Sequence, residues 1–290
     1  MATPAPAPPL RLAVLSCEDS APYLTSSSTC PTGPVLELLQ QTFDGALEAC
    51  NNRAGEGEGG ARFGCVDFDV FSVKGEGSFY PSSFEQYDGV LIPGSLSSSY
   101  DTSPWIVKLG ETVKKLHEEK VKTIGICFGH QIIAHYGGGA TCKNEKGGNV
   151  GQATFEVTQD GERLCFGFGE GVLGEEGGVG AKLDLLCSHN DIVCTRPPNS
   201  ATILSSETVE FQALSYQDDK GRPYMFTIQS HPEYSPNVEG KADIIKDITE
   251  AFCVDVKEGD EKLKNIEWDK VKRGSERIVS AFLYKLFYEN

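Results

Sequence analysis

Short apolar, β-branched runs alternate with longer amphipathic stretches in the first half of the chain. These runs, each followed by turn residues, are Leu12–Leu15, Val66–Val70, Gly89–Ile92 and Thr123–Ile126. Helical spacing of apolar residues predicts one helix over residues 34–50, and an N-cap Ser103 before Pro104 predicts another that runs to about Lys120. Strands that alternate with helices need crossover connections, which favour an α/β fold with a doubly wound, mainly parallel central sheet flanked by helices. Sites in such folds lie beyond the carboxyl ends of the strands.

The predicted strands become shorter after His130. Strands that are partly antiparallel are predicted at residues 150–158, 182–187, 201–205, 211–216 and 224–229. Amphipathic helices are predicted at residues 238–252 and 271–288. The 290 residues contain no internal repeat and no clear linker. We therefore expect a disordered lead rich in Pro and Ala over residues 1–9, and a single domain over residues 10–290 that closes with helices.

The charge balance narrows the classes of partner. Lys and Arg number 26 against 42 Asp and Glu, a formal net charge of -16. Such a surface repels phosphate backbones and anionic lipids, so we expect neither nucleic acid nor a membrane as partner. The N-terminus lacks the basic region and long apolar core of a secretory signal, and the ten cysteines include no CxxC pair. Most thiols are therefore expected to be reduced and buried, in a protein that is cytoplasmic, or cytoplasmic and nuclear.

Cys127 differs from the other cysteines in its neighbours. Gly125-Ile-Cys-Phe-Gly129 is the cysteine version of the G-x-S-x-G nucleophile elbow, and it lies between a predicted strand and a predicted helix. Small flanking residues permit a strained turn that lifts the thiol clear of the sheet. The positive end of the following helix favours the thiolate, which is the attacking form. The backbone N–H of Phe128 is expected to point toward a developing oxyanion.

A nucleophilic thiol needs a base, and the base needs a group that orients it. Three of the five histidines are expected to do neither: His117 lies in a charged helix and should be solvated, while His130 and His135 should pack or cap. His231 ends a strand-like run, where the carboxyl edge of the sheet would bring it to the elbow. Glu233, two residues on, would share one face of an extended segment with His231.

The segments GICFGHQ and, far along the chain, SHPEY together resemble the class I glutamine amidotransferase family with a Cys-His-Glu triad. Three further stretches fit this family: YDGVLIPGSL at 87–96, NEKGGNVG at 144–151, and SHNDIV at 188–193 with Pro197. The match spans residues 10 to 250 in the family's order. The resemblance implies a flavodoxin-like fold and a small-molecule substrate. Within the family, the chain is similar to standalone γ-glutamyl peptidases and to the glutaminase domains of GMP synthetases.

The resemblance also implies roles for single residues in the reaction. Cys127 would be the nucleophile, His231 the base and then the acid, and Glu233 the group that orients His231. The backbone N–H groups of Ser95 and Phe128 would form the oxyanion hole. Many members have two glycines where this chain has Gly94-Ser95. Serine at position 95 keeps the backbone N–H, so the expected donor is still present.

Three residues are expected to bind the substrate. The resemblance implies this role for Gly94 and for Gln131, which would contact the α-amino-acid end of the glutamyl group. It also suggests His189, for which a purely structural hydrogen bond in the core is equally open.

The predicted reaction is acyl transfer to water. The Cys127 thiolate attacks a γ-carbonyl, His231 protonates the leaving amine, and water hydrolyses the γ-glutamyl thioester, with no metal or cofactor needed. The substrate is left open between glutamine and a γ-glutamyl compound. The chain has no ATP-binding P-loop, so we expect no fused synthetase.

Three alternatives stay open at this point. In the first, the chain is a glutaminase subunit that feeds ammonia to a separate synthetase. In the second, it is a non-enzymatic sensor with an oxidisable Cys127 thiol. Esterase or lipase chemistry fits less well, because those enzymes generally use Ser and place the acid before the His.

Overall fold

The structure is a computed structural model that describes residues 7–18, 34–55, 62–75, 78–166, 178–234 and 264–289. The helix predicted at residues 238–252 and the first six residues of the predicted lead lie outside these described residues. The organisation into one domain over residues 10–290 stays a prediction.

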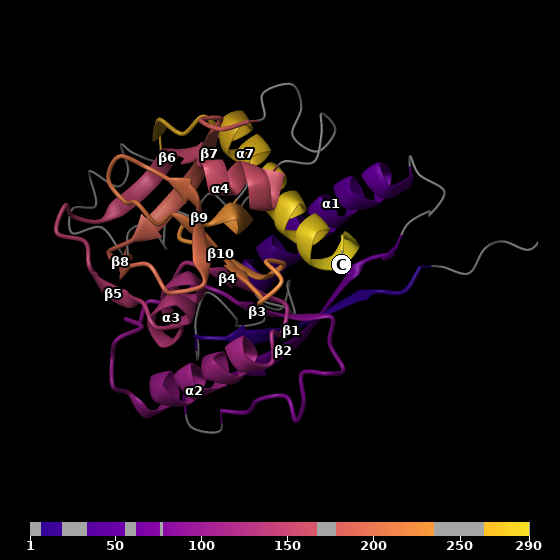
Figure 1. Cartoon of the computed structure of the whole chain (residues 1–290), viewed down its shortest axis with the longest axis vertical. Coiled ribbons are helices and arrows are strands. Elements are labelled where there is room, and N and C mark those ends of the chain that lie inside the picture. Colours follow the sequence, from indigo (N-terminus) through magenta and orange to yellow (C-terminus); the bar gives the residue numbers. More distant parts are fainter. Residues whose placement is uncertain are drawn as a thin grey trace, which may run out of the picture.

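In the described part of the chain, nine strands form one sheet in the order β2-β1-β3-β4-β11-β10-β9-β6-β7 (Figure 1). The first five pair in parallel and are β2 (Val66–Ser72), β1 (Leu10–Ser16), β3 (Gly89–Ile92), β4 (Thr123–Ile126) and β11 (Pro223–Ile228). The others pair antiparallel and are β10 (Ala213–Gln217), β9 (Ser200–Ser205), β6 (Asn149–Val157) and β7 (Lys182–His189). The carboxyl ends of β1, β3 and β4 therefore meet along one edge of the parallel half.

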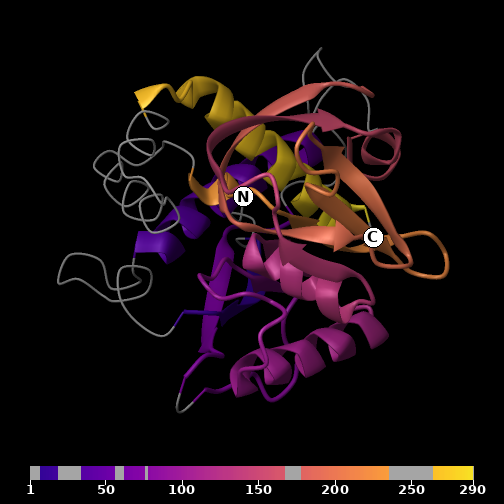
Figure 2. The same ribbon diagram turned by 90° about the vertical axis from the view of Figure 1, so that its left-hand side faces the viewer.

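The helices cover the two faces of the parallel half. The longer helices are α1 (Pro34–Gly55), α2 (Pro104–Glu118), α3 (Phe128–Tyr136) and α7 (Trp268–Leu283). Short helical turns are α4 (Gln159–Gly161) and the segments Glu162–Phe166, Pro232–Tyr234 and Tyr284–Tyr288. Figure 1 shows α1 and α7 together on one side and α2 with α3 on the other. Figure 2 shows α7 (yellow) and α2 (purple) at opposite ends of the turned view.

Side-chain alternation along β1 explains this layering. Leu12 and Val14 join the core cluster that contains residues of α1 and α7, whereas Ala13 and Leu15 join the cluster that contains residues of α2 and α3. Successive side chains of a strand point to opposite faces, so an almost wholly apolar strand is the signature of a sheet covered on both sides. The predicted doubly wound sheet is confirmed, with a four-stranded antiparallel extension.

Most predicted elements are confirmed within a few residues, and two strands were missed. These are β5 (Ala140–Lys143) and β8 (Asp191–Thr195), which pair antiparallel in a separate small sheet. β5 has four residues without an apolar run, and the apolar run of β8, Ile192–Cys194, is only three residues long, so the signal of both strands is weak. Ser103 lies at the N-cap of α2 as predicted, but its side chain makes no capping hydrogen bond.

No helix among the described residues has both the length and the apolar character that a membrane crossing requires.

Candidate active site

Cys127 lies at the tip of a tight turn between β4 and α3. Its φ of 51° is in the left-handed region, which non-glycine residues rarely adopt and which marks a strained backbone. The turn is fixed from both sides: the Cys127 N–H donates to Ile228 O at 2.8 Å, and its carbonyl accepts from Gln131 N at 3.0 Å. The elbow predicted from the sequence is therefore present, with the thiol at the carboxyl edge of the parallel strands.

Both glycines of the elbow are required by close contacts. A Cβ on Gly125 would lie 2.7 Å from the Ile133 side chain and 2.9 Å from the Gly129 backbone. A Cβ on Gly129 would overlap the carbonyl oxygen of Ile92, at the end of β3. Real Cβ atoms do not approach backbone atoms so closely. The two glycines thus allow α3 to begin directly against the end of the sheet.

His231 and Glu233 lie beside this turn, and the structure brings all three predicted triad residues together. His231 Nδ1 is 2.8 Å from Glu233 Oε1, and both side chains are almost completely buried. Nδ1 donates to the carboxylate, because a carboxylate only accepts. The other ring nitrogen, Nε2, has no hydrogen-bond partner of good geometry in the described part of the chain. It is the nitrogen left to face the Cys127 sulfur.

The protonation state of His231 is set by Cys127 and Glu233. Burial disfavours the imidazolium, but negative charge on Cys127 and Glu233, with the hydrogen bond to Glu233, outweighs burial and raises the pKa of His231 to about 10. A protonated His231 at neutral pH is matched to the task of delivering a proton to a leaving group.

The local backbone differs from the extended segment expected around His231. Residues Pro232–Tyr234 form a 3₁₀ turn, and Tyr234 N donates to His231 O at 3.2 Å. Pro232 fixes φ near the value that a 3₁₀ turn needs, so it turns the chain instead of extending it. The Tyr234 ring stacks on the imidazole at 4.3 Å between centroids and holds it in place.

Gln229 is a neighbour of the thiol that was not predicted from the sequence. Its Nε2 donates to Cys127 Sγ at 3.7 Å, and the thiol also approaches Ser188 O at 4.0 Å. Gln229 is fully buried just past the end of β11. In the sequence, Gln229 is a polar residue directly after an apolar strand and two residues before His231. This pattern is the signal that could have predicted its role beside the thiol.

Of the two expected oxyanion donors, Phe128 belongs to the elbow and Ser95 lines the same cleft as Cys127. In the described part of the chain, no acceptor binds the backbone N–H of Ser95 or that of Phe128. Gly94 lies against the triad: a Cβ there would be 3.1 Å from His231 Cε1 and 3.7 Å from Cys127 Cβ. A glycine at this position therefore leaves room for the imidazole. The contact of Gly94 with substrate stays a prediction.

A cleft of about 240 Å³ opens onto the thiol. It is lined by Ser95, Leu96, Ser97, Ser98, Tyr100, Cys127, Gln131, Lys143, His189, Asn190 and Asp191. Gln131 borders the cleft, but its amide donates to Asp191 O at 2.9 Å and to Gln229 Oε1 at 3.3 Å. Its role in binding substrate stays a prediction. Lys143 is the single Lys or Arg in this lining and is exposed.

His189 borders the same cleft and is buried. Its Nδ1 donates to Asp191 O at 3.1 Å, and Nε2 has no partner among the described residues. Burial and the nearby His231 lower the pKa of His189 to about 4, so the ring is neutral and Nε2 is an acceptor. Both roles expected for His189 are compatible with this position.

The remaining histidines have structural contacts. His130 binds Thr227 Oγ1 at 2.8 Å and Phe211 O at 3.1 Å, and His135 binds Thr141 Oγ1 at 3.0 Å. The expectation of a solvated His117 is wrong. This ring contacts Tyr224 OH at 3.0 Å and Ile133 O at 3.3 Å, because α2 packs its last turn against α3 and β11.

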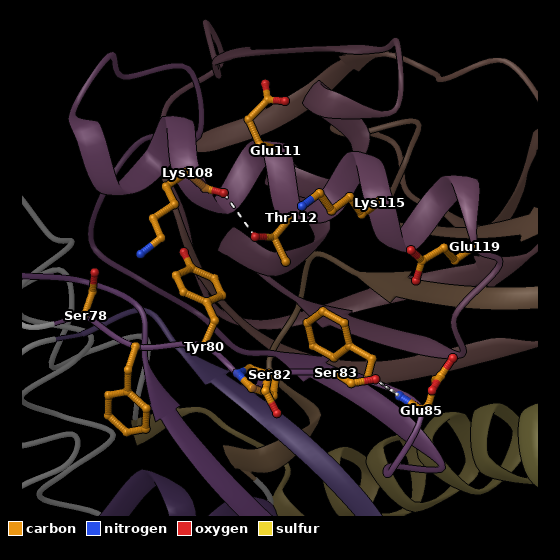
Figure 3. A pocket seen from close by; sticks show the side chains of 13 residues that line it. Ser78, Tyr80, Ser82, Ser83, Glu85, Lys108, Glu111, Thr112, Lys115 and Glu119 are labelled. Carbon is orange, nitrogen blue, oxygen red and sulfur yellow. Dashed lines mark hydrogen bonds between the residues drawn. The ribbon is translucent and has the colours of Figure 1, made fainter.

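A larger cavity of about 740 Å³ lies away from the thiol. Its wall is formed by residues 78–85 and by the outer side of α2, where Lys108, Glu111 and Lys115 lie (Figure 3). None of its lining residues is a cysteine or histidine. Among the described residues, no group of three or more His, Cys, Asp or Glu side chains is arranged to hold a metal ion.

Comparisons with known proteins agree with this geometry. The sequence profile of the family described as "Glutamine amidotransferase class-I" matches residues 66–251. Gamma-glutamyl peptidase 3 of Arabidopsis thaliana is 32% identical over 70% of this chain and 74% of that protein. A GMP synthase [glutamine-hydrolyzing] of Wolinella succinogenes is 27% identical over 67% of this chain and 33% of that protein.

The fold also matches solved structures. A glutamine amidotransferase of Thermotoga maritima superposes with a TM-score of 0.61 at 15% identity, covering 97% of this chain and 99% of the other. At that identity the likeness shows the fold alone.

Proposed function

Because this chain belongs to the class I glutamine amidotransferase family, we propose that it hydrolyses the γ-amide bond of a small γ-glutamyl compound. The single observation that supports this most is the position of Cys127. Cys127 lies at a strained turn with φ 51°. It lies beside the imidazole of His231, whose Nδ1 is 2.8 Å from the buried carboxylate of Glu233.

The first step is acylation. The Cys127 thiolate attacks the γ-carbonyl carbon, and the carbonyl oxygen becomes an oxyanion that the N–H groups of Ser95 and Phe128 stabilise. His231 then gives its proton to the leaving amine, and the C–N bond breaks. Glu233 keeps the imidazole in the tautomer and orientation that this transfer needs.

The second step is hydrolysis of the γ-glutamyl thioester. Neutral His231 accepts a proton from water as the hydroxide oxygen attacks the thioester carbon. Glutamate leaves, Cys127 returns to the thiolate, and His231 is again protonated. Every proton is carried by a residue of this chain, so the reaction needs no metal or cofactor.

A γ-glutamyl peptide or amide is favoured over free glutamine. The relative with 32% identity is named for γ-glutamyl peptidase activity, and the cleft at Cys127 is also lined by the polar segment Ser95–Ser98, Tyr100 and Lys143. These side chains offer contacts to a large leaving group, whereas glutamine releases only ammonia.

A second candidate is supported by the GMP synthase relative. In that case the substrate is glutamine, and a separate synthetase is the partner that receives ammonia. The cytoplasmic, or cytoplasmic and nuclear, location also stays a proposal, which imaging of a tagged chain tests.

In the deciding experiment, purified protein is incubated separately with glutamine, glutathione and a γ-glutamyl amide. The glutamate and the amine released from each are measured, with Cys127→Ala as control. Release from glutathione or the amide with little from glutamine supports the proposal. Ammonia from glutamine alone supports the second candidate. No turnover of any of the three, with Cys127 still alkylated rapidly, contradicts both and favours a thiol sensor.

A further inference from the structure

A partly buried carboxylate contacts the turn that carries the expected oxyanion donor Ser95. Glu18 follows the carboxyl end of β1, and the turn Gly94-Ser95-Leu96 follows the end of the neighbouring β3. Glu18 Oε1 is 2.7 Å from Ser95 Oγ and 2.7 Å from Leu96 N. Both groups donate to it, because a carboxylate only accepts. The carboxylate thus binds the side chain of Ser95 and the peptide unit that follows it.

The other oxygen of Glu18 is fixed by a cation. Lys74 Nζ lies 2.8 Å from Glu18 Oε2, and the two side chains are only 21% and 13% exposed. A partly buried ion pair with short hydrogen bonds is well ordered, because releasing either partner leaves the other charge poorly solvated. Three donors therefore converge on Glu18: a hydroxyl, a backbone N–H and an ammonium.

Lys74 also connects this turn to Phe128, whose backbone N–H is the second expected oxyanion donor. The Lys74 ammonium lies 5.4 Å from the centroid of the Trp105 ring, and that ring lies 5.7 Å from the ring of Phe128. Phe128 follows the nucleophile and begins α3. A continuous series of contacts thus joins Ser95 to Phe128 without passing through Cys127, His231 or Glu233.

We propose that Glu18 is a positioning residue that holds the Ser95 N–H in the direction required to stabilise the oxyanion; this rests on the proposed function. The direction of the Ser95 N–H depends on rotation of the backbone at Ser95. The Glu18 bond to the Ser95 hydroxyl fixes the side chain, and its bond to Leu96 N fixes the next peptide plane. Ser97 N also donates to Ser95 Oγ at 3.1 Å. The Ser95 N–H belongs to the preceding Gly94–Ser95 peptide, which leads on from β3. A Ser95 anchored by its side chain and by the following peptide limits the rotation of this preceding peptide, so its N–H keeps one direction.

This role explains why serine is compatible with a turn where many family members have glycine. The hydroxyl of Ser95 donates to Glu18 at 2.7 Å and lies 3.1 Å from Cys17 O. The side chain thereby adds an anchor to the turn. It also explains why the partner is an acid: glutamine in place of Glu18 would direct an NH₂ group at one of three donors.

The decisive variant is Glu18→Gln, which keeps shape and removes charge. Loss of an oxyanion donor lowers kcat by about a hundredfold to a thousandfold, and a misdirected donor costs less. We expect kcat for a γ-glutamyl amide to fall about tenfold to a hundredfold, with KM within about threefold. Alkylation of Cys127 by iodoacetamide should keep its wild-type rate, because that displacement forms no oxyanion. Hydrogen exchange at the Leu96 amide should become faster.

The matched control is Glu111→Gln, an exposed acid of α2 paired with Lys114, which should keep wild-type kcat. If Glu18→Gln fails to fold, Lys74→Gln tests the same pair, with an expected fall in kcat of about threefold to tenfold. Wild-type kcat in the folded Glu18→Gln protein would overturn the proposal. So would an equal loss of kcat and alkylation rate, which would mean that Glu18 supports Cys127 itself. A wild-type chain that turns over no γ-glutamyl amide would instead reject the proposed function, and the role of Glu18 with it.

Discussion

The Nδ1 atom of His231 lies 2.8 Å from Oε1 of Glu233, with 4% and 2% of the two side chains exposed. So little exposure leaves almost no water to screen the pair. The carboxylate therefore acts on the imidazole at full strength and fixes which nitrogen carries the proton. The other ring nitrogen has no hydrogen-bond partner among the described residues, and the four predictions that follow depend on this pair, on the turn at Cys127 or on the cleft beside it.

Glu233→Gln should lower kcat by about a hundredfold or more and change KM little. The amide keeps the shape of the side chain, but it removes the charge that stabilises the imidazolium and can donate to Nδ1, which reverses the tautomer. Steady-state kinetics on a γ-glutamyl amide measure this. The exposed Glu210→Gln is the matched control. Equal kcat in the two variants would contradict the role of Glu233.

The pH dependence of kcat/KM should show an alkaline limb governed by His231. Its pKa is raised from an ordinary 6.5 to about 10, so the ring stays protonated well above neutral pH, and the stability that its partners give it is fully present below the ordinary pKa. The proton and this stability are both lost as pH rises through about 10. Glu233→Gln removes one of the raising charges and should move this limb to lower pH. A limb at the same pH in both proteins would show that another group governs it.

Gly129→Ala should destabilise the fold by about 3 kcal/mol or more, because the new methyl would overlap the carbonyl oxygen of Ile92, which the sheet holds in place. The control is Gly45→Ala in α1, where a Cβ meets nothing within 4 Å. That change should stabilise the fold by about 1 kcal/mol, the gain of alanine over glycine in a helix. Denaturant unfolding measures both. Equal stability of the two variants would mean that the elbow is not closely packed.

Lys143→Ala should raise KM for a γ-glutamyl substrate about threefold to tenfold and leave kcat nearly unchanged. Lys143 is the cation in the lining of the cleft, and every γ-glutamyl compound carries a carboxylate. Because Lys143 is exposed, the expected effect is modest. Lys146→Ala, outside the cleft lining, should leave KM at its wild-type value. A KM that rises equally in both variants would indicate only a general charge effect.

The sequence predicted the elbow and the fold well, because their signals are local. Gly125, Cys127 and Gly129 lie within five residues. Their spacing indicates a turn too tight for a Cβ at either glycine, as the structure shows. The apolar strands likewise reveal a sheet covered on both faces. His231 was found because a polar residue follows an apolar strand, and this is also a local pattern.

What the sequence did not predict depends on contacts between distant segments. Glu18 meets Ser95 across 77 positions, and His117 meets Tyr224 across 107. No local pattern distinguishes these side chains from solvated ones. The 3₁₀ turn at Pro232–Tyr234 was missed for another reason. Proline is compatible with both an extended and a turned backbone, so the residue pattern does not distinguish the two.

The central claim is that Cys127 carries the γ-glutamyl group during the reaction. The most direct measurement mixes the protein with excess γ-glutamyl amide, quenches it in acid within the first turnovers, and analyses the peptides by mass spectrometry. The account predicts a mass increase of one γ-glutamyl group on the peptide that contains Cys127, removed by hydroxylamine and absent in Cys127→Ala. Turnover in the wild-type protein with no such adduct on Cys127, or turnover that persists in Cys127→Ala, would contradict it.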